Sequence, residues 1–165
     1  MNLDTLGKYK NTIISEFLNS QSIIDILLPN PDIQYEIDDQ LLGNEQLGLK
    51  GLMFPFEYIP DIIDTKSTFI CTEIIAQIKN TNVCNMTVYV YAFTHKSNMR
   101  YKRSGAIGTR IDILVSDIDK LLNGNSNFGI GKLNLERVDI YIPEKDFYGR
   151  RLMYSVPEFN RQSGT

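Results

Sequence analysis

The fold is decided by residues 86–122, which read MTVYVYAFTHKSNMRYKRSGAIGTRIDILVSDIDKLL. Over 86–95, valine and alanine alternate with tyrosine and phenylalanine, and this alternation predicts a β-strand. Over 107–122, apolar residues recur at helical spacing, which predicts an amphipathic helix that Gly124 stops. A basic loop joins the two. This order of elements indicates a sheet that is covered by a long helix.

The predicted helix 107–122 has two distinct sides. The side expected to pack on the sheet carries Ile107, Ile111, Leu114, Ile118, Leu121 and Leu122. The side expected to face solvent carries Asp112, Ser116, Asp119 and Lys120. Because a helix of this kind buries one face, it needs a partner sheet in the same domain.

The remaining segments are predicted on both sides of this unit. The N-terminal part gives a helix over 3–19, a short helix over 23–28 that Ser20 or Ser22 caps, and a loop with a short helical piece over 33–50. Pro55 and Pro60 exclude a central strand from 51–64, which is expected to lie extended over the core. Alternation predicts strands over 68–79, 132–142 and 148–156.

Pairing and class follow from this order. The strands 68–79 and 86–95 are expected to form an antiparallel hairpin, and 148–156 is expected to pair with 132–142 until Pro157 ends the pairing. Helices and strands are segregated, so the class is α+β, with a small, mostly antiparallel sheet packed by the long helix and the N-terminal helix. One domain is expected over 1–165.

Within that domain we expect three parts. These are a helical and irregular N-terminal part over 1–66, a sheet-helix core over 67–159 and a flexible tail over 160–165. Hydrophobic residues make up 42% of the chain and charged residues 22%, which is typical of a globular domain. No signal peptide is expected at the start, and the apolar runs are too short to predict a membrane span.

Residues able to do chemistry are few. His95 is the only histidine, which excludes a histidine metal cluster, and it is expected at the surface at the end of a strand. Cys71 and Cys84 are expected to be buried thiols of a protein made in a reducing cytoplasm. The run Gly105-Ala-Ile-Gly108 lacks the pattern of a phosphate-binding loop, and flexibility explains its glycines better. We expect no catalytic site, no metal and no cofactor, so the protein is not expected to be an enzyme.

Charge is unevenly distributed along a chain of net charge −3. Residues 25–64 contain nine carboxylates and one cation, Lys50, whereas 95–110 contains cations and no acid. The two regions either attract each other between copies, as in a head-to-tail ring, or remain two solvated surfaces. The candidate assembly or DNA-contact loop consists of Lys96, Arg100, Tyr101, Lys102, Arg103 and Arg110. Its partner is an acidic protein surface, the phosphates of DNA, or solvent alone.

The C-terminal half resembles a known family. The helix RIDILVSDIDKLL over 110–122 and the closing strand YGRRLMYSVPEF over 148–159, together with the leading helix and central hairpin, are similar to bacteriophage tail-terminator or tail-completion proteins of the neck. The resemblance covers residues 67–159 and rests on the order of elements. The acidic, proline-broken segment 30–66 departs from it.

The resemblance implies a function in virion assembly. It implies a homo-oligomeric ring, a hexamer, at the head-proximal end of the tail, made in the host cytoplasm and carried in the virion. Such a ring would end polymerisation of the tail tube protein and join the tail to the head-completion protein. Double-stranded DNA would pass through its lumen without sequence specificity. Open alternatives are a head-completion stopper, a connector adaptor, a small nucleic-acid-binding module and a small enzyme whose 104–110 loop receives a phosphate.

Overall fold

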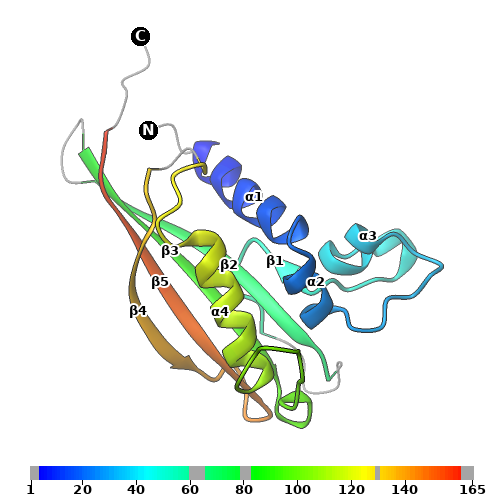
Figure 1. Cartoon of the computed structure of the whole chain (residues 1–165). Helices are drawn as coiled ribbons and strands as arrows, with labels where there is room; N and C mark the ends of the chain where they lie inside the picture. Colours follow the sequence, from blue (N-terminus) through cyan, green and yellow to red (C-terminus); the bar gives the residue numbers. More distant parts are fainter. Residues whose placement is uncertain (1–3, 60–65, 79–82, 129–130, 161–165) are drawn as a thin grey trace.

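The computed structural model describes residues 4–59, 66–78, 83–128 and 131–160 (Figure 1). The helices are α1 (Asp4–Leu18), α2 (Gln21–Leu27), α3 (Ile37–Leu42) and α4 (Arg110–Leu122), and the strands are β1 (Met53–Phe54), β2 (Thr68–Ile78), β3 (Val83–His95), β4 (Asn134–Tyr141) and β5 (Phe147–Asn160). Two short 3-10 turns lie at Glu45–Leu47 and Lys96–Asn98. The α+β class is confirmed.

Across the described residues, five strands form one sheet in the order β1-β2-β3-β5-β4. β1 runs parallel to β2, and every other pair is antiparallel. The expected hairpin of β2 and β3 and the expected pairing of β4 with β5 are both confirmed. In addition, β5 pairs along the length of β3, so that β4 forms the far edge of the sheet (Figure 1).

One face of the sheet is covered by α1, α2 and α4 (Figure 1). Ile13 and Phe17 of α1, and Ile111, Leu114 and Ile118 of α4, are completely buried against strand residues such as Val88, Val90 and Leu152. The expected helix-on-sheet packing is therefore confirmed at its centre. Burial of this apolar surface is the main favourable term that holds the helices on the sheet.

The opposite face carries a second, aromatic cluster. Phe69 and Phe93 stack with their ring centroids 5.3 Å apart. The chain after β1 covers them, since Phe54 and Tyr58 stack at 4.2 Å and both lie near Phe69. The expected extended segment over the core is confirmed as far as residue 59, and residues 60–64 lie outside the described part.

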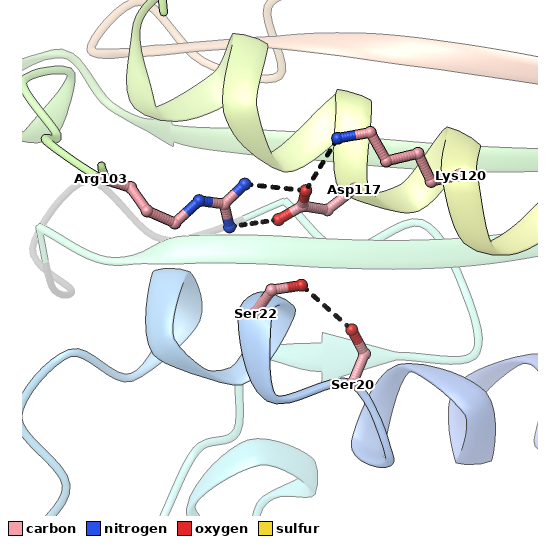
Figure 2. Close-up of polar contacts among 5 residues, drawn as sticks. All are labelled: Ser20, Ser22, Arg103, Asp117 and Lys120. Carbon is pink, nitrogen blue, oxygen red and sulfur yellow. Dashed lines mark hydrogen bonds and ion pairs between the residues drawn. The ribbon is translucent and has the colours of Figure 1, made fainter. Parts of the chain in front are cut away.

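The N-terminal region follows the expectation closely. Ser20 is the N-cap residue of α2, but its hydroxyl contacts the hydroxyl of Ser22 at 3.3 Å and makes no capping bond (Figure 2). The short helical piece expected within 33–50 is α3. A buried glutamine, Gln40, fixes the chain before it by donating to the carbonyls of Asp32 and Tyr35 and accepting from the Asp32 amide.

The start of α4 corrects the sequence prediction. The helix begins at Arg110, and Ile107, which was expected in the core, is 98% exposed. Thr109 and Asp112 form a reciprocal capping box that fixes the first turn. Gly108 has a φ of +125°, which is not a helical conformation, so the helix does not extend back through it. The apolar spacing of Ile107 therefore continues the helical pattern by coincidence.

The faces of β4 also correct the prediction. Leu135 pairs with Tyr154 and Arg137 with Met153, so Glu136 is an extra residue in a β-bulge. Leu135 therefore lies on the helix-covered side, whereas Arg137 and the residues at alternate positions after it lie on the aromatic side. The strict alternation expected over 132–142 was wrong because one inserted residue exchanges the faces.

The end of β5 is the third correction. The strand was expected to stop at Val156, yet its backbone remains paired to Asn160. Cys84 pairs with Phe159 and Met86 with Val156, so two residues, the first of them Pro157, lie opposite one residue of β3. A bulge tolerates a proline because it leaves one backbone donor unpaired. The flexible tail expected from residue 160 falls, from residue 161 on, outside the described part.

Candidate functional site

The basic loop between β3 and α4 is anchored at both ends. The Lys96 amide donates to the carbonyl of Asp146 at 2.8 Å, and the Arg110 amide donates to the carbonyl of Met99 at 2.8 Å. His95 ends β3, half-buried, with its Nδ1 accepting from the Ser97 amide at 3.2 Å. Such bonds hold the loop in one conformation, so its side chains present a defined surface.

Arg110 lies beneath this surface, not on it. Only 6% of the residue is exposed, and its guanidinium donates to the carbonyls of Ile26 and Asn98, both at 2.8 Å. The guanidinium carbon lies 4.6 Å from the centre of the Tyr101 ring, a cation–π contact. Burial lowers the pKa of Arg110. This residue links α2, the loop and α4, and is therefore structural.

Arg103 is likewise engaged inside the molecule (Figure 2). Its two terminal nitrogens donate to the two carboxylate oxygens of Asp117 on α4, at 2.5 and 2.8 Å. Asp117 is buried, and Lys120 contributes a longer contact of 3.9 Å. The hydrogen bond that Arg103 donates to Asp117 raises the pKa of Arg103. A bidentate pair of this kind fixes the loop against the helix.

The other candidate residues divide into two groups. Lys96 donates from its ammonium to the carbonyl of Lys145, and the ring of Tyr101 packs half-buried under Arg110. Arg100 and Lys102 are exposed, and neither forms an ion pair with a described residue. Of the cations predicted to make contacts, these two are the ones that the loop leaves available to a partner.

A carboxylate, that of Asp112, lies at the end of the glycine run, where α4 begins. Asp112 accepts from the Thr109 amide at 2.9 Å and from the Thr109 hydroxyl at 2.7 Å. The bond from the backbone amide, and to a lesser extent the bond from the hydroxyl, hold the pKa of Asp112 below its usual range. A negative charge already occupies the place at the helix N-terminus where a phosphate would bind.

The β4 edge is a feature that the sequence did not single out. Val138 is 43% exposed and Ile140 61% exposed, and Ile142 just beyond the strand is also exposed. Val138 pairs with Leu152 and Ile140 with Arg150, which places both on the helix-covered side of the sheet. Yet α4 packs on β3 and β5, so these side chains remain uncovered. The sequence signal that could have indicated this surface was the apolar residues at 138, 140 and 142, together with the lack of a further predicted helix to cover them.

An acidic surface lies at the opposite side of the fold, around α3. It consists of exposed carboxylates and exposed apolar side chains: Asp32, Glu36, Asp38, Glu45, Leu42 and Leu47. We call this set the acidic corner. Ile33, beside it, is 99% exposed. The sequence had shown the excess of acid here but not the apolar residues that accompany it.

Chemical sites are not evident in the described part of the chain. Its His, Cys, Asp and Glu residues form no cluster that could hold a metal ion. Burial raises the pKa of the Cys71 thiol to about 12, which leaves it protonated and unreactive at neutral pH. The side chain of Cys84 lies outside the described residues. None of the described helices has the length and apolar character needed to cross a membrane.

Most of the chain matches the model of one known protein family. Residues 14–156 match the YomW family, from within α1 to near the end of β5. The chain belongs to the YomW family. This is a Bacillus phage-type protein family, so the phage association that the sequence implied is supported at this level. The chain matches no curated protein.

Proposed function

We propose that this chain is a structural subunit of a phage particle, specifically a tail-terminator or tail-completion protein. In this proposal its copies form a ring, a hexamer, at the head-proximal end of the tail. The ring ends polymerisation of the tail tube and joins the tail to the head-completion protein. The subunit acts in the virion without catalysis or cofactor.

The observation that carries this proposal is the open β4 edge. Among the described residues, β4 is the last strand of the sheet and carries uncovered apolar side chains at Val138 and Ile140. Proteins that act alone usually protect a sheet edge, and an apolar edge is a template for pairing with another chain. At the other edge, β1 pairs with only two residues of β2, Ile70 and Cys71. The partner is proposed at β4 because three exposed apolar residues, Val138, Ile140 and Ile142, follow one another there.

The basic loop offers too few available cations for a protein that recognises a specific DNA sequence. Arg100 and Lys102 supply two available cations on a chain of net charge −3. Specific readers of DNA usually carry a strongly basic face with several side chains that reach base edges. In the proposed ring, DNA passes through the lumen without sequence-specific contacts.

The proposal is tested in a phage whose copy of this gene is disrupted. We expect tails of uncontrolled length and heads without tails, because nothing ends the tube. Tails of normal length that fail to join filled heads would instead indicate a stopper or an adaptor. Normal, joined particles would contradict any role in the neck.

Complementation tests the β4 edge itself. The variant Ile140→Lys should fail to restore joined particles, because a charge replaces an apolar contact at the proposed interface. The control is Ile75→Lys, which changes an exposed isoleucine of β2, a strand that β3 and β5 separate from β4. If Ile140→Lys restored particles as well as the control, β4 would not be an assembly edge.

A further inference from the structure

We propose that neighbouring copies of this chain contact each other through the acidic corner of one copy and the basic loop of the next. This inference rests on the proposed function, since it names the surfaces that join subunit to subunit. It is carried by the charges that each surface leaves unpaired, by the apolar residues that each exposes and by the rigidity of both.

The acidic corner has carboxylates without internal partners. Glu36, Asp38 and Glu45 form no ion pair with any residue in the described ranges. Their backbone is nevertheless fixed, because buried Gln40 bonds the chain before α3 and Asn44 donates to Asp39 at 2.9 Å. Fixed carboxylates of one sign create a surface that attracts cations of another molecule.

The basic loop is the complementary surface. Two of its arginines are engaged internally, Arg103 in an ion pair with Asp117 and Arg110 in hydrogen bonds to backbone carbonyls, so they hold the loop and are not available to a partner. Arg100 and Lys102 remain exposed beside them. A loop that is anchored from within and charged on its outer side loses little conformational freedom when it binds.

Apolar residues accompany the charges on both surfaces. Ile107 is 98% exposed in the basic loop, and Leu42 and Leu47 are exposed at the acidic corner. Isoleucine and leucine gain free energy when they leave water, so each surface offers an apolar contact among its charges. An apolar centre with a charged surround is the usual composition of a protein–protein interface.

Within the described part of one chain, no ion pair joins the two surfaces. The α3 region and the loop border a common groove of about 320 Å³, lined by Ile24 and Leu28 of the α2 region, Ile37 of α3 and Tyr101 of the loop. Figure 1 shows α3 and the loop before α4 as separate parts of the molecule. Because each copy carries one surface of each kind, one copy's loop can bind the next copy's corner. Repetition of such a contact closes into a ring when the rotation allows it.

Charge exchange tests this contact on the purified full chain. One variant carries Arg100→Glu with Lys102→Glu, and a second carries Asp38→Lys with Glu45→Lys. A control carries Lys8→Glu with Lys132→Glu, which changes the net charge as much as the first variant at exposed lysines of other surfaces. Oligomer mass is measured by light scattering, and folding is checked by circular dichroism.

We expect each charge-exchange variant alone to be monomeric and folded, while the control assembles like the wild type. An equimolar mixture of the two variants should assemble again, because every loop then meets a corner of opposite charge in an alternating ring. Assembly of the wild type should weaken as salt is raised, since these charges are exposed.

The outcomes separate this inference from the proposed function. A wild-type ring that persists in the Arg100→Glu, Lys102→Glu variant, or two monomeric variants that do not assemble when mixed, would overturn the contact and leave the ring intact. A wild-type dimer with the expected charge dependence would support the contact and overturn the ring. A wild-type monomer at every concentration would overturn both.

Discussion

The pair of Arg103 and Asp117 allows a quantitative test of how the basic loop is held. Replacing Arg103 by alanine removes both hydrogen bonds and leaves the Asp117 carboxylate, whose side chain is 7% exposed, without its main partner. Breaking a fully buried pair costs about 3–5 kcal/mol. Arg103 itself is 29% exposed and Lys120 stays within 3.9 Å of Asp117, so we expect about 2–3 kcal/mol here.

The assay is urea unfolding followed by circular dichroism at one fixed protein concentration, since self-association would shift the apparent stability. A loss of this size should lower the melting temperature by roughly 4–12 °C in a domain of this length. The matched control is Arg100→Ala, which removes an exposed cation of the same loop and should change stability by less than about 0.5 kcal/mol.

A second variant distinguishes the cost of leaving the Asp117 carboxylate unpaired from the cost of changing the loop conformation. Adding Asp117→Asn to Arg103→Ala replaces the unpaired carboxylate by a neutral side chain of the same shape. It should recover part of the lost stability, because the buried charge is the larger cost. If Arg103→Ala unfolded at the same urea concentration as Arg100→Ala, the pair would not anchor the loop and the reasoning would be refuted.

Three further changes test other parts of the fold. Ile118→Asp places a carboxylate at a fully buried site of α4 and should unfold the protein, and wild-type melting would show that the helix does not pack as described. Thr72→Val should raise stability by about 1 kcal/mol, because the buried Thr72 hydroxyl lacks a hydrogen-bond partner among the described residues, and a loss in urea unfolding would indicate a hidden partner. The pKa of Asp112 is lower in the folded state than in the unfolded state, so the stability that it contributes is present above about pH 4 and is lost as pH falls through the folded pKa. The difference in free energy of unfolding between the wild type and Asp112→Asn should therefore shrink on acidification.

The fold could be predicted largely from periodicity. The apolar spacing of Ile111, Leu114 and Ile118 gave the packing face of α4, and the alternation over 86–95 gave the central strand. Such patterns are local, and burial of one face enforces them directly. The failures were local interruptions of the pattern. A bulge at Glu136 and another at Pro157 each add one residue without changing the appearance of the sequence around them.

The candidate site was predicted less well, because contacts with residues distant in the sequence determine which of its cations are available to a partner. Arg103 and Arg100 are indistinguishable in the sequence, yet Arg103 pairs with Asp117, fourteen residues away, whereas Arg100 forms no ion pair within the described part of the chain. Arg110 is bound by the carbonyl of Ile26, eighty-four residues earlier. A backbone acceptor leaves no compositional signal, so the sequence could not show that this cation is internal. The open β4 edge depended in turn on the strand order, which alternation does not determine.

We propose that this YomW-family chain is a subunit of a homo-oligomeric ring. The most direct measurement is the mass of the purified protein by light scattering, with negative-stain images of the same sample. We expect a mass of about six times the 18.9 kDa of the chain and images of rings with a central opening. The proposal would be contradicted if the protein remained a single species of 18.9 kDa at every concentration measured and the images showed no rings.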